Sequence, residues 1–196
     1  MDREKLLKKI DTFNDELINI RRHIHAHPEL SGLENQTAIL ISGYLKNIGW
    51  RVKESVGRTG VVAEFGPIDK GFIGLRVDMD ALPIYENTNL SFSSKIDGVM
   101  HACGHDLHTC IGLGVAKIIK DLNLKFGTRI IFQPAEEIAS GAKWMIDDGV
   151  TIGLKQILGV HVFPDLLVGT IGIKEGSLTA AAGELSVEIL GKSGPV

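Results

Sequence analysis

Residues 72–80 read Phe-Ile-Gly-Leu-Arg-Val-Asp-Met-Asp, and this stretch decides the expected fold. It begins with a short apolar run that follows Pro67 and Gly71, and such a run predicts a buried strand. Two carboxylates, Asp78 and Asp80, come directly after that run. Because an open α/β sheet has its ligand-binding crevice at the carboxyl ends of its strands, we expect these carboxylates to lie near a functional site.

The rest of the chain alternates between strand-like and helix-like segments. Short apolar runs predict further strands at 61–65, 129–132 and 156–162, and an alternating pattern predicts one at 185–190. Helical patterns of apolar residues predict helices at 3–25, 35–47, 109–122 and 141–147. We therefore expect an α/β fold, namely a three-layer αβα sandwich with a mostly parallel central sheet.

The composition is that of a globular protein and excludes several other classes. Of the 196 residues, 44% are hydrophobic and 23% are charged, which is unlike a disordered or fibrous chain. The net charge of −3 gives no electrostatic footprint for nucleic acid. The N-terminus lacks the apolar core of a signal peptide, and no apolar run reaches the roughly 18 residues that span a bilayer. With only two cysteines, Cys103 and Cys110, the sequence predicts a cytoplasmic protein without membrane or nucleic-acid partners.

The densest group of reactive side chains lies at residues 100–109, which read Met-His-Ala-Cys-Gly-His-Asp-Leu-His-Thr. Thiolate, imidazole and carboxylate are ligands of zinc, manganese and similar divalent ions, and Gly104 lets the backbone turn so that Cys103 and His105 can converge on one ion. In an alternative interpretation the histidines only cap the next helix, but several donors so closely spaced favour a metal site. A structural zinc site fits less well because the sequence contains no CxxC knuckle.

A second group, Glu136 and Glu137, follows the strand predicted at 129–132. Adjacent carboxylates repel each other when both are buried, so one of them needs a proton or a cation. In a metal hydrolase one carboxylate coordinates the ion and the other takes a proton from the attacking water. The alternative is an acidic pair at a helix N-terminus, which the helix dipole favours. His161, near the end of a later predicted strand, is a third candidate ligand.

These motifs together resemble the M20-type metallopeptidases, in their amidohydrolase branch. That branch includes hippurate hydrolases, N-acyl-amino-acid hydrolases and hydrolases of indoleacetic acid–amino acid conjugates. The resemblance implies a two-metal site in an αβα catalytic domain, with a smaller lid or dimerisation domain inserted late in the sequence. The matching stretches run in family order and are Arg21–Leu30, Leu75–Pro83, Met100–Thr109, Phe132–Glu137 and His161 with Pro164.

Carried over residue by residue, the resemblance implies four metal ligands, and these are Cys103, His105, Glu137 and His161. The family binds two divalent ions, zinc, manganese or similar. Glu136 corresponds to the general base, and Asp80 corresponds to an acid that orients a ligand. The implied activity is a metal-dependent amidohydrolase that cleaves the amide bond of N-acyl amino acids or similar small conjugates by metal-activated water.

The resemblance also implies that family members continue beyond this chain. We expect residues 1–184 to form the N-terminal portion of the catalytic domain and residues 185–196 to begin a lid or dimerisation domain that is truncated. The family usually has a histidine where Pro195 stands here. The missing part would hold one more metal-binding histidine, so the expectation for the isolated chain is weak activity. A homodimer is expected of full-length members, not of this shorter chain.

Two alternatives from other classes stay open. One is a non-catalytic fragment that retains a partial metal site. The other is a cysteine hydrolase in which Cys103 is the nucleophile and His105 the base, and it is less favoured because donors from separate strand ends suit coordination. The sequence leaves the acyl group, the amino acid and the metal undetermined.

Overall fold

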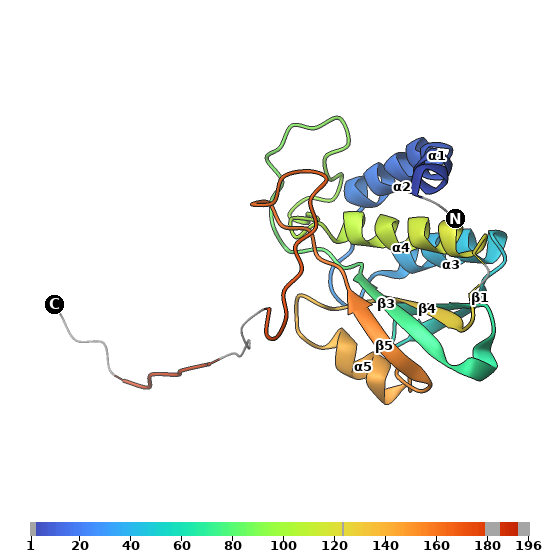
Figure 1. Ribbon diagram of the computed structural model, residues 1–196. Coiled ribbons are helices and arrows are strands. Elements are labelled where there is room, and N and C mark those ends of the chain that lie inside the picture. Colours follow the sequence, from blue (N-terminus) through green and yellow to red (C-terminus); the bar gives the residue numbers. More distant parts are fainter. Residues whose placement is uncertain (1–2, 123, 179–184, 192–196) are drawn as a thin grey trace. The chain divides into compact units, whose positions relative to one another are not determined.

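The computed structural model describes residues 3–122, 124–178 and 185–191, and the chain divides into two compact units, Met1–Val162 and Phe163–Val196. All the helices and strands found among the described residues lie in the first unit (Figure 1). The prediction of a strand at 185–190 is wrong. Residues 185–191 form no strand and leave their large apolar side chains exposed, because a strand needs a hydrogen-bonding partner and an alternating pattern does not supply one.

The predicted domain boundary after residue 184 stays a prediction. It adjoins residues 179–184, which lie outside the described residues, as do residues 192–196 with Pro195. The division that the backbone contacts give falls earlier, between Val162 and Phe163. All the predicted metal ligands and the predicted catalytic residues, Glu136 and Asp80, belong to the first unit.

The first unit is built on a five-stranded mixed sheet with the order β1-β2-β4-β3-β5. Strands β3, β4 and β5 are mutually parallel, and β2 is antiparallel to both β1 and β4, so β2 alone runs against the other four. The prediction of an α/β fold is confirmed. The strands are β1 (Arg51–Val56), β2 (Gly60–Phe65), β3 (Phe72–Asp78), β4 (Gly127–Gln133) and β5 (Leu154–Gly159).

Helices cover both faces of this sheet, as the three-layer prediction requires (Figure 1). Successive side chains of a strand point to opposite faces. Val61 and Phe132 therefore pack into one apolar cluster with α3 and α4, while Val62 and Ile131 pack into a second cluster with α5. The helices are α1 (Arg3–Asp11), α2 (Asn14–Ala26), α3 (Asn35–Asn47), α4 (His105–Ile119) and α5 (Gly141–Asp147), and a short 3₁₀ turn, η1 (Ile68–Lys70), precedes β3.

The helices predicted at 35–47 and 141–147 are confirmed, and two other helix predictions need correction. The single helix predicted at 3–25 is two helices, α1 and α2. The Thr12 hydroxyl and backbone N–H both donate to Lys9 O, and this local pairing competes with continuation of the helix. The helix predicted to begin at 109 begins at His105, because Gly104 adopts a φ of +82° immediately before it.

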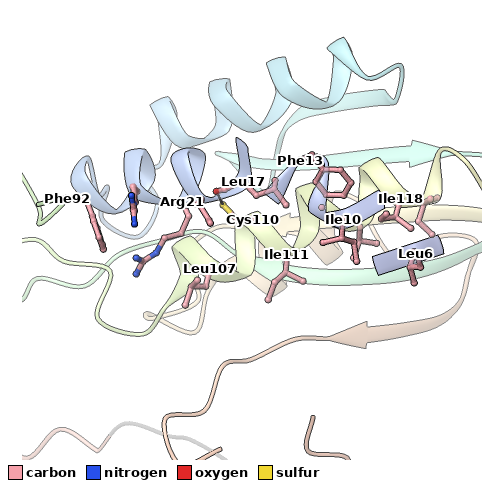
Figure 2. A pocket seen from close by; sticks show the side chains of 15 residues that line it. Leu6, Ile10, Phe13, Leu17, Arg21, Phe92, Leu107, Cys110, Ile111 and Ile118 are labelled. Carbon is pink, nitrogen blue, oxygen red and sulfur yellow. Dashed lines mark hydrogen bonds between the residues drawn. The ribbon is translucent and has the colours of Figure 1, made fainter. Parts of the chain in front are cut away.

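An apolar groove of about 680 Å³ runs between α1, α2 and α4 (Figure 2). Leu6, Ile10 and Leu17 line one side of it, and Leu107 and Ile111 line the other. Within the described part of the chain, its lining includes none of the predicted metal ligands. The same part of the chain contains no helix with the length and apolar character needed to span a membrane.

Candidate metal centre

The candidate site lies where the parallel strands β3, β4 and β5 end. Asp78 is the last residue of β3 and Asp80 lies two residues further on, and both are fully or almost fully buried. Glu136 and Glu137 follow β4, and His161 lies two residues beyond β5. Because parallel strands end at the same edge of a sheet, three segments that are distant in sequence meet there. The N-terminus of α4 adds the stretch from Cys103 to His108 to the same place.

His105 lies at the centre of the predicted ligand set. Its Nε2 is 3.6 Å from Glu137 Oε1 and 3.8 Å from Glu136 Oε2. Cys103 Sγ lies 3.5 Å from His161 Nε2. One ligand atom from each of Cys103, His105 and His161 falls within 4.8 Å of the others, and the same holds for His105, Glu136 and Glu137. The structure thus brings together all four residues predicted as ligands and the predicted base.

The Asp80 carboxylate is hydrogen-bonded to the His105 ring. His105 Nδ1 lies 3.0 Å from Asp80 Oδ1, and Asp80 Oδ2 accepts hydrogen bonds from the Ser31 hydroxyl at 2.6 Å and from the Glu137 backbone N–H at 3.0 Å. Burial opposes ionisation of Asp80, but these hydrogen bonds outweigh it and lower the pKa of the carboxyl. An ionised Asp80 accepts the Nδ1 proton, so the neutral form of His105 has its lone pair on Nε2, which faces the other candidate ligands.

The residues present fit a divalent cation. His105 Nε2 and Glu137 Oε1 are buried, face each other and have no hydrogen-bond partner among the residues that the structure describes. An unsatisfied buried polar group costs about 1–3 kcal/mol. With a neutral His105 ring and an ionised Glu137, two lone pairs face each other, and a cation between them would satisfy both. Imidazole, carboxylate and thiol are also the donor types that zinc-like ions prefer.

The environment of Cys103 argues against a nucleophilic cysteine. Burial, together with the negative charges of Glu137, Glu136 and Asp78, raises the pKa of its thiol to about 12. A reactive cysteine needs a lowered pKa and a positive neighbourhood. A thiolate at this position needs a compensating cation, which a bound metal supplies. The cysteine hydrolase alternative is therefore disfavoured by the charges around the thiol.

A third group of possible donors, Asp78, His105 and His108, contains a hydrogen-bonded pair, Asp78 and His108. His108 Nδ1 is bonded to Asp78, and His108 Nε2 accepts the backbone N–H of Val162 at 2.9 Å. Both ring nitrogens are thus engaged. The sequence places His108 in the reactive stretch but does not reveal either partner, because Asp78 is thirty residues away and Val162 fifty-four.

Sequence reasoning also missed a buried network beneath the start of α4. Asp106 forms ion pairs with Arg21 Nε at 2.6 Å and with His25 Nδ1 at 2.8 Å, and His25 Nε2 reaches Glu86 at 3.3 Å. The hydrogen bond with Asp106 raises the pKa of His25. Arg21 and His25 are four residues apart and so share one face of α2, which is the signal that could have suggested a common partner.

Comparisons with known proteins identify relatives of this chain. A family model described as "Peptidase family M20/M25/M40" matches residues 74–196. The chain is 52% identical to a probable hydrolase of Synechocystis sp. (91% of this chain, 46% of that protein). It is 47% identical to an N-acetylcysteine deacetylase of Bacillus subtilis (93% and 49%). The chain spans about half the length of the curated relatives it matches.

A solved structure shares the fold. The crystal structure of a Bacillus subtilis protein described as a dinuclear metal-binding peptidase of the M20 family superposes with a TM-score of 0.81 at 48% identity. The match covers 85% of this chain and 48% of that chain.

Proposed function

Because the chain belongs to the peptidase family M20/M25/M40, we propose that it provides the metal centre of a metal-dependent amidohydrolase acting on N-acyl amino acids or similar small amides. The observation that carries the proposal is the pair of buried, unpartnered atoms, His105 Nε2 and Glu137 Oε1, that face each other across 3.6 Å within the described residues. The substrate class is supported by the N-acetylcysteine deacetylase activity named for a relative at 47% identity.

Four residues would hold the metal, namely Cys103, His105, Glu137 and His161. We propose two divalent ions, of the zinc or manganese type, because the related M20 structure is described as dinuclear. The soft sulfur of Cys103 favours zinc or another transition ion over magnesium. When bound, such ions polarise an amide carbonyl and make water a stronger acid. A cytoplasmic location is proposed on the chemistry of the two cysteines, which are both unpaired thiols.

Glu136 and Asp80 have different proposed roles in the reaction. The Glu136 side chain is 36% exposed, and its Oε2 lies 3.8 Å from His105 Nε2, so it borders the metal site and can reach a solvent molecule there. It would accept the proton of the attacking water and pass it to the nitrogen of the leaving amine. Asp80 would hold the Nδ1 proton of His105 and keep the ring turned toward the metal.

The acidic pair offers a matched test of these roles. In a chain extended by the family's C-terminal part, Glu136→Gln should keep its bound metal and lower the hydrolysis of N-acetyl amino acids by about 10²- to 10⁴-fold, the contribution typical of a general base. Glu137→Gln should lose metal affinity by about tenfold or more, because it removes a ligand charge. Metal content is measured by elemental analysis, and hydrolysis by release of the free amino acid.

The outcomes separate the possible functions. Similar metal loss in both variants would contradict the division of labour between the two carboxylates. Full metal content in the unaltered chain without hydrolysis of any N-acyl amino acid would favour a non-catalytic fragment with a partial metal site. Hydrolysis that survives a chelator and stops on alkylation of Cys103 would favour the cysteine hydrolase.

A further inference from the structure

His161 is proposed as a metal ligand, yet it lies in a segment without regular secondary structure. Strand β5 ends at Gly159, and the Val160 N–H makes one more bond to Arg76 O, at 3.4 Å, before the chain leaves the sheet. His161 itself is exposed. A ligand on an irregular segment needs another restraint to hold its imidazole in place.

That restraint is present one residue later. The Val162 backbone N–H donates to His108 Nε2 at 2.9 Å. The hydrogen bonds of Val160 and Val162 thus flank His161 on both sides. The Val162 side chain also packs against Gly104, where an added Cβ would lie only 2.7 Å from Val162 Cγ2. His161 Nδ1 is directed to Val162 O at 2.7 Å, so the ring presents its Nε2 lone pair toward Cys103.

His108 can accept this bond only in one protonation form. A backbone N–H can only donate, so His108 Nε2 must carry a lone pair and Nδ1 must carry the proton. Nδ1 bonds to Asp78, which is buried and lies 2.7 Å from Arg76. A carboxylate oxygen of Asp78 accepts the Nδ1 proton, and the Val162 N–H occupies Nε2. These two contacts together fix the tautomer of His108.

We propose that His108 is a positioning residue for the metal centre. It does not bind metal; it holds the His161–Val162 peptide, and thereby the His161 imidazole, in the ligand position. Asp78 selects the tautomer of His108 that can do this. The inference rests on the proposed function, because it assigns His161 a ligand role.

Two variants of the same side-chain class separate this role from a general structural one. His108→Gln can place its amide oxygen near the position of Nε2 and accept the Val162 N–H. His108→Asn is one methylene shorter; its amide can donate to Asp78 from the position of Nδ1 but cannot reach Val162. Zinc affinity is measured in competition with a chromophoric chelator, and exchange of the Val162 amide is measured by NMR in the metal-free protein.

We expect His108→Asn to lower zinc affinity by about 10- to 100-fold, the effect typical of residues that orient a ligand. The Val162 amide should exchange faster in this variant, and His108→Gln should stay within about threefold of the original affinity. In a double variant with His161→Ala, His108→Asn should cause little further loss of zinc affinity, because both changes remove the same interaction, that of His161 with the metal. Multiplicative losses would overturn the proposal.

Failure of this inference and failure of the metal centre give different results. Equal zinc affinity of the unaltered chain and His161→Ala would overturn the metal centre, and the inference with it. If His161→Ala binds zinc weakly while His108→Asn binds zinc as tightly as the unaltered chain, only the role of His108 is overturned. If His108→Asn does not fold, His108→Gln decides, because lost zinc affinity with a protected Val162 amide would contradict the proposal.

Discussion

Replacing Asp80 with Asn keeps the shape of the side chain and removes its charge at the point where His105 is held. Asp80 receives three donors on two oxygens, from His105 Nδ1, the Ser31 hydroxyl and the Glu137 N–H. Asn has one amide oxygen and one NH₂ group, so it cannot accept on both sides. If its oxygen faces Ser31 and Glu137, its NH₂ faces His105 Nδ1. The His105 proton then moves to Nε2 and blocks the proposed ligand atom.

The magnitude follows from the bond that is lost. A hydrogen bond to a charged group contributes about 1.5–3 kcal/mol, and the His105–Asp80 contact is of this kind and fully buried. Because about 1.4 kcal/mol corresponds to a factor of ten in an equilibrium constant, the expected loss of zinc affinity is about 10- to 100-fold. If the amide oxygen faces His105 instead, the NH₂ group faces the Glu137 N–H. Two donors cannot bond to each other, so the proposed ligand Glu137 is then displaced instead of His105.

Zinc affinity is measured by competition with a chromophoric chelator, with Ser31→Ala as the matched control. Ser31 donates to the same carboxylate but does not touch His105, so its loss should change zinc affinity by less than about threefold, since it removes one hydrogen bond from a carboxylate that keeps two others. His105→Ala gives the zinc affinity of a site that has lost this ligand completely. The reasoning is refuted if Asp80→Asn binds zinc within threefold of the original chain while His105→Ala binds weakly.

Two further predictions concern stability. Gly112 and Gly114 lie on different faces of α4, and alanine at either gains about 1 kcal/mol of helix propensity. An added Cβ at Gly112 meets the fully buried Phe132 at 2.9 Å, whereas one at Gly114 meets the end of the half-buried Leu17 side chain at 3.0 Å, which can shift. Gly112→Ala should therefore lower the free energy of unfolding by about 1 kcal/mol and Gly114→Ala should not, as denaturant titration would show. The raised pKa of His25 means that its pair with Asp106 stabilises the fold fully below about pH 6.5 and loses this effect as pH rises through the raised pKa. The stability deficit of His25→Gln should therefore shrink between about pH 6 and pH 9, and a constant deficit would contradict the assignment.

Much of the architecture is encoded locally and could be predicted from sequence. The strand at residues 72–78 is a short apolar run after Gly71. The helices at 35–47 and 141–147 begin and end at the residues that the sequence predicts. Strand β1 escaped prediction because its sequence, Arg-Val-Lys-Glu-Ser-Val, is mostly charged or polar. It exposes charged side chains such as Lys53 and Glu54, and its pairing with β2 defines it better than its own pattern does.

The reactive residue types of the site were also readable from sequence, but their relations were not. Cys103 and His105 are near neighbours, and so are Glu136 and Glu137, so local spacing indicated metal chemistry. His161 is fifty-eight residues from Cys103, and its place beside the thiol depends on β5 pairing with β3. The family resemblance suggested the ligand set, but strand order supplies the physical reason why the set is compact.

The sequence by itself determined most of the strands and helices and which side chains are candidate metal ligands, because propensity, periodicity and donor chemistry belong to near neighbours. Only the tertiary structure decided which nitrogen of each histidine carries its lone pair. Asp80 sets the tautomer of His105, and Asp78 with the Val162 N–H sets that of His108. These partners come from other strands and loops, so their effect exists only after the sheet has formed and buried them.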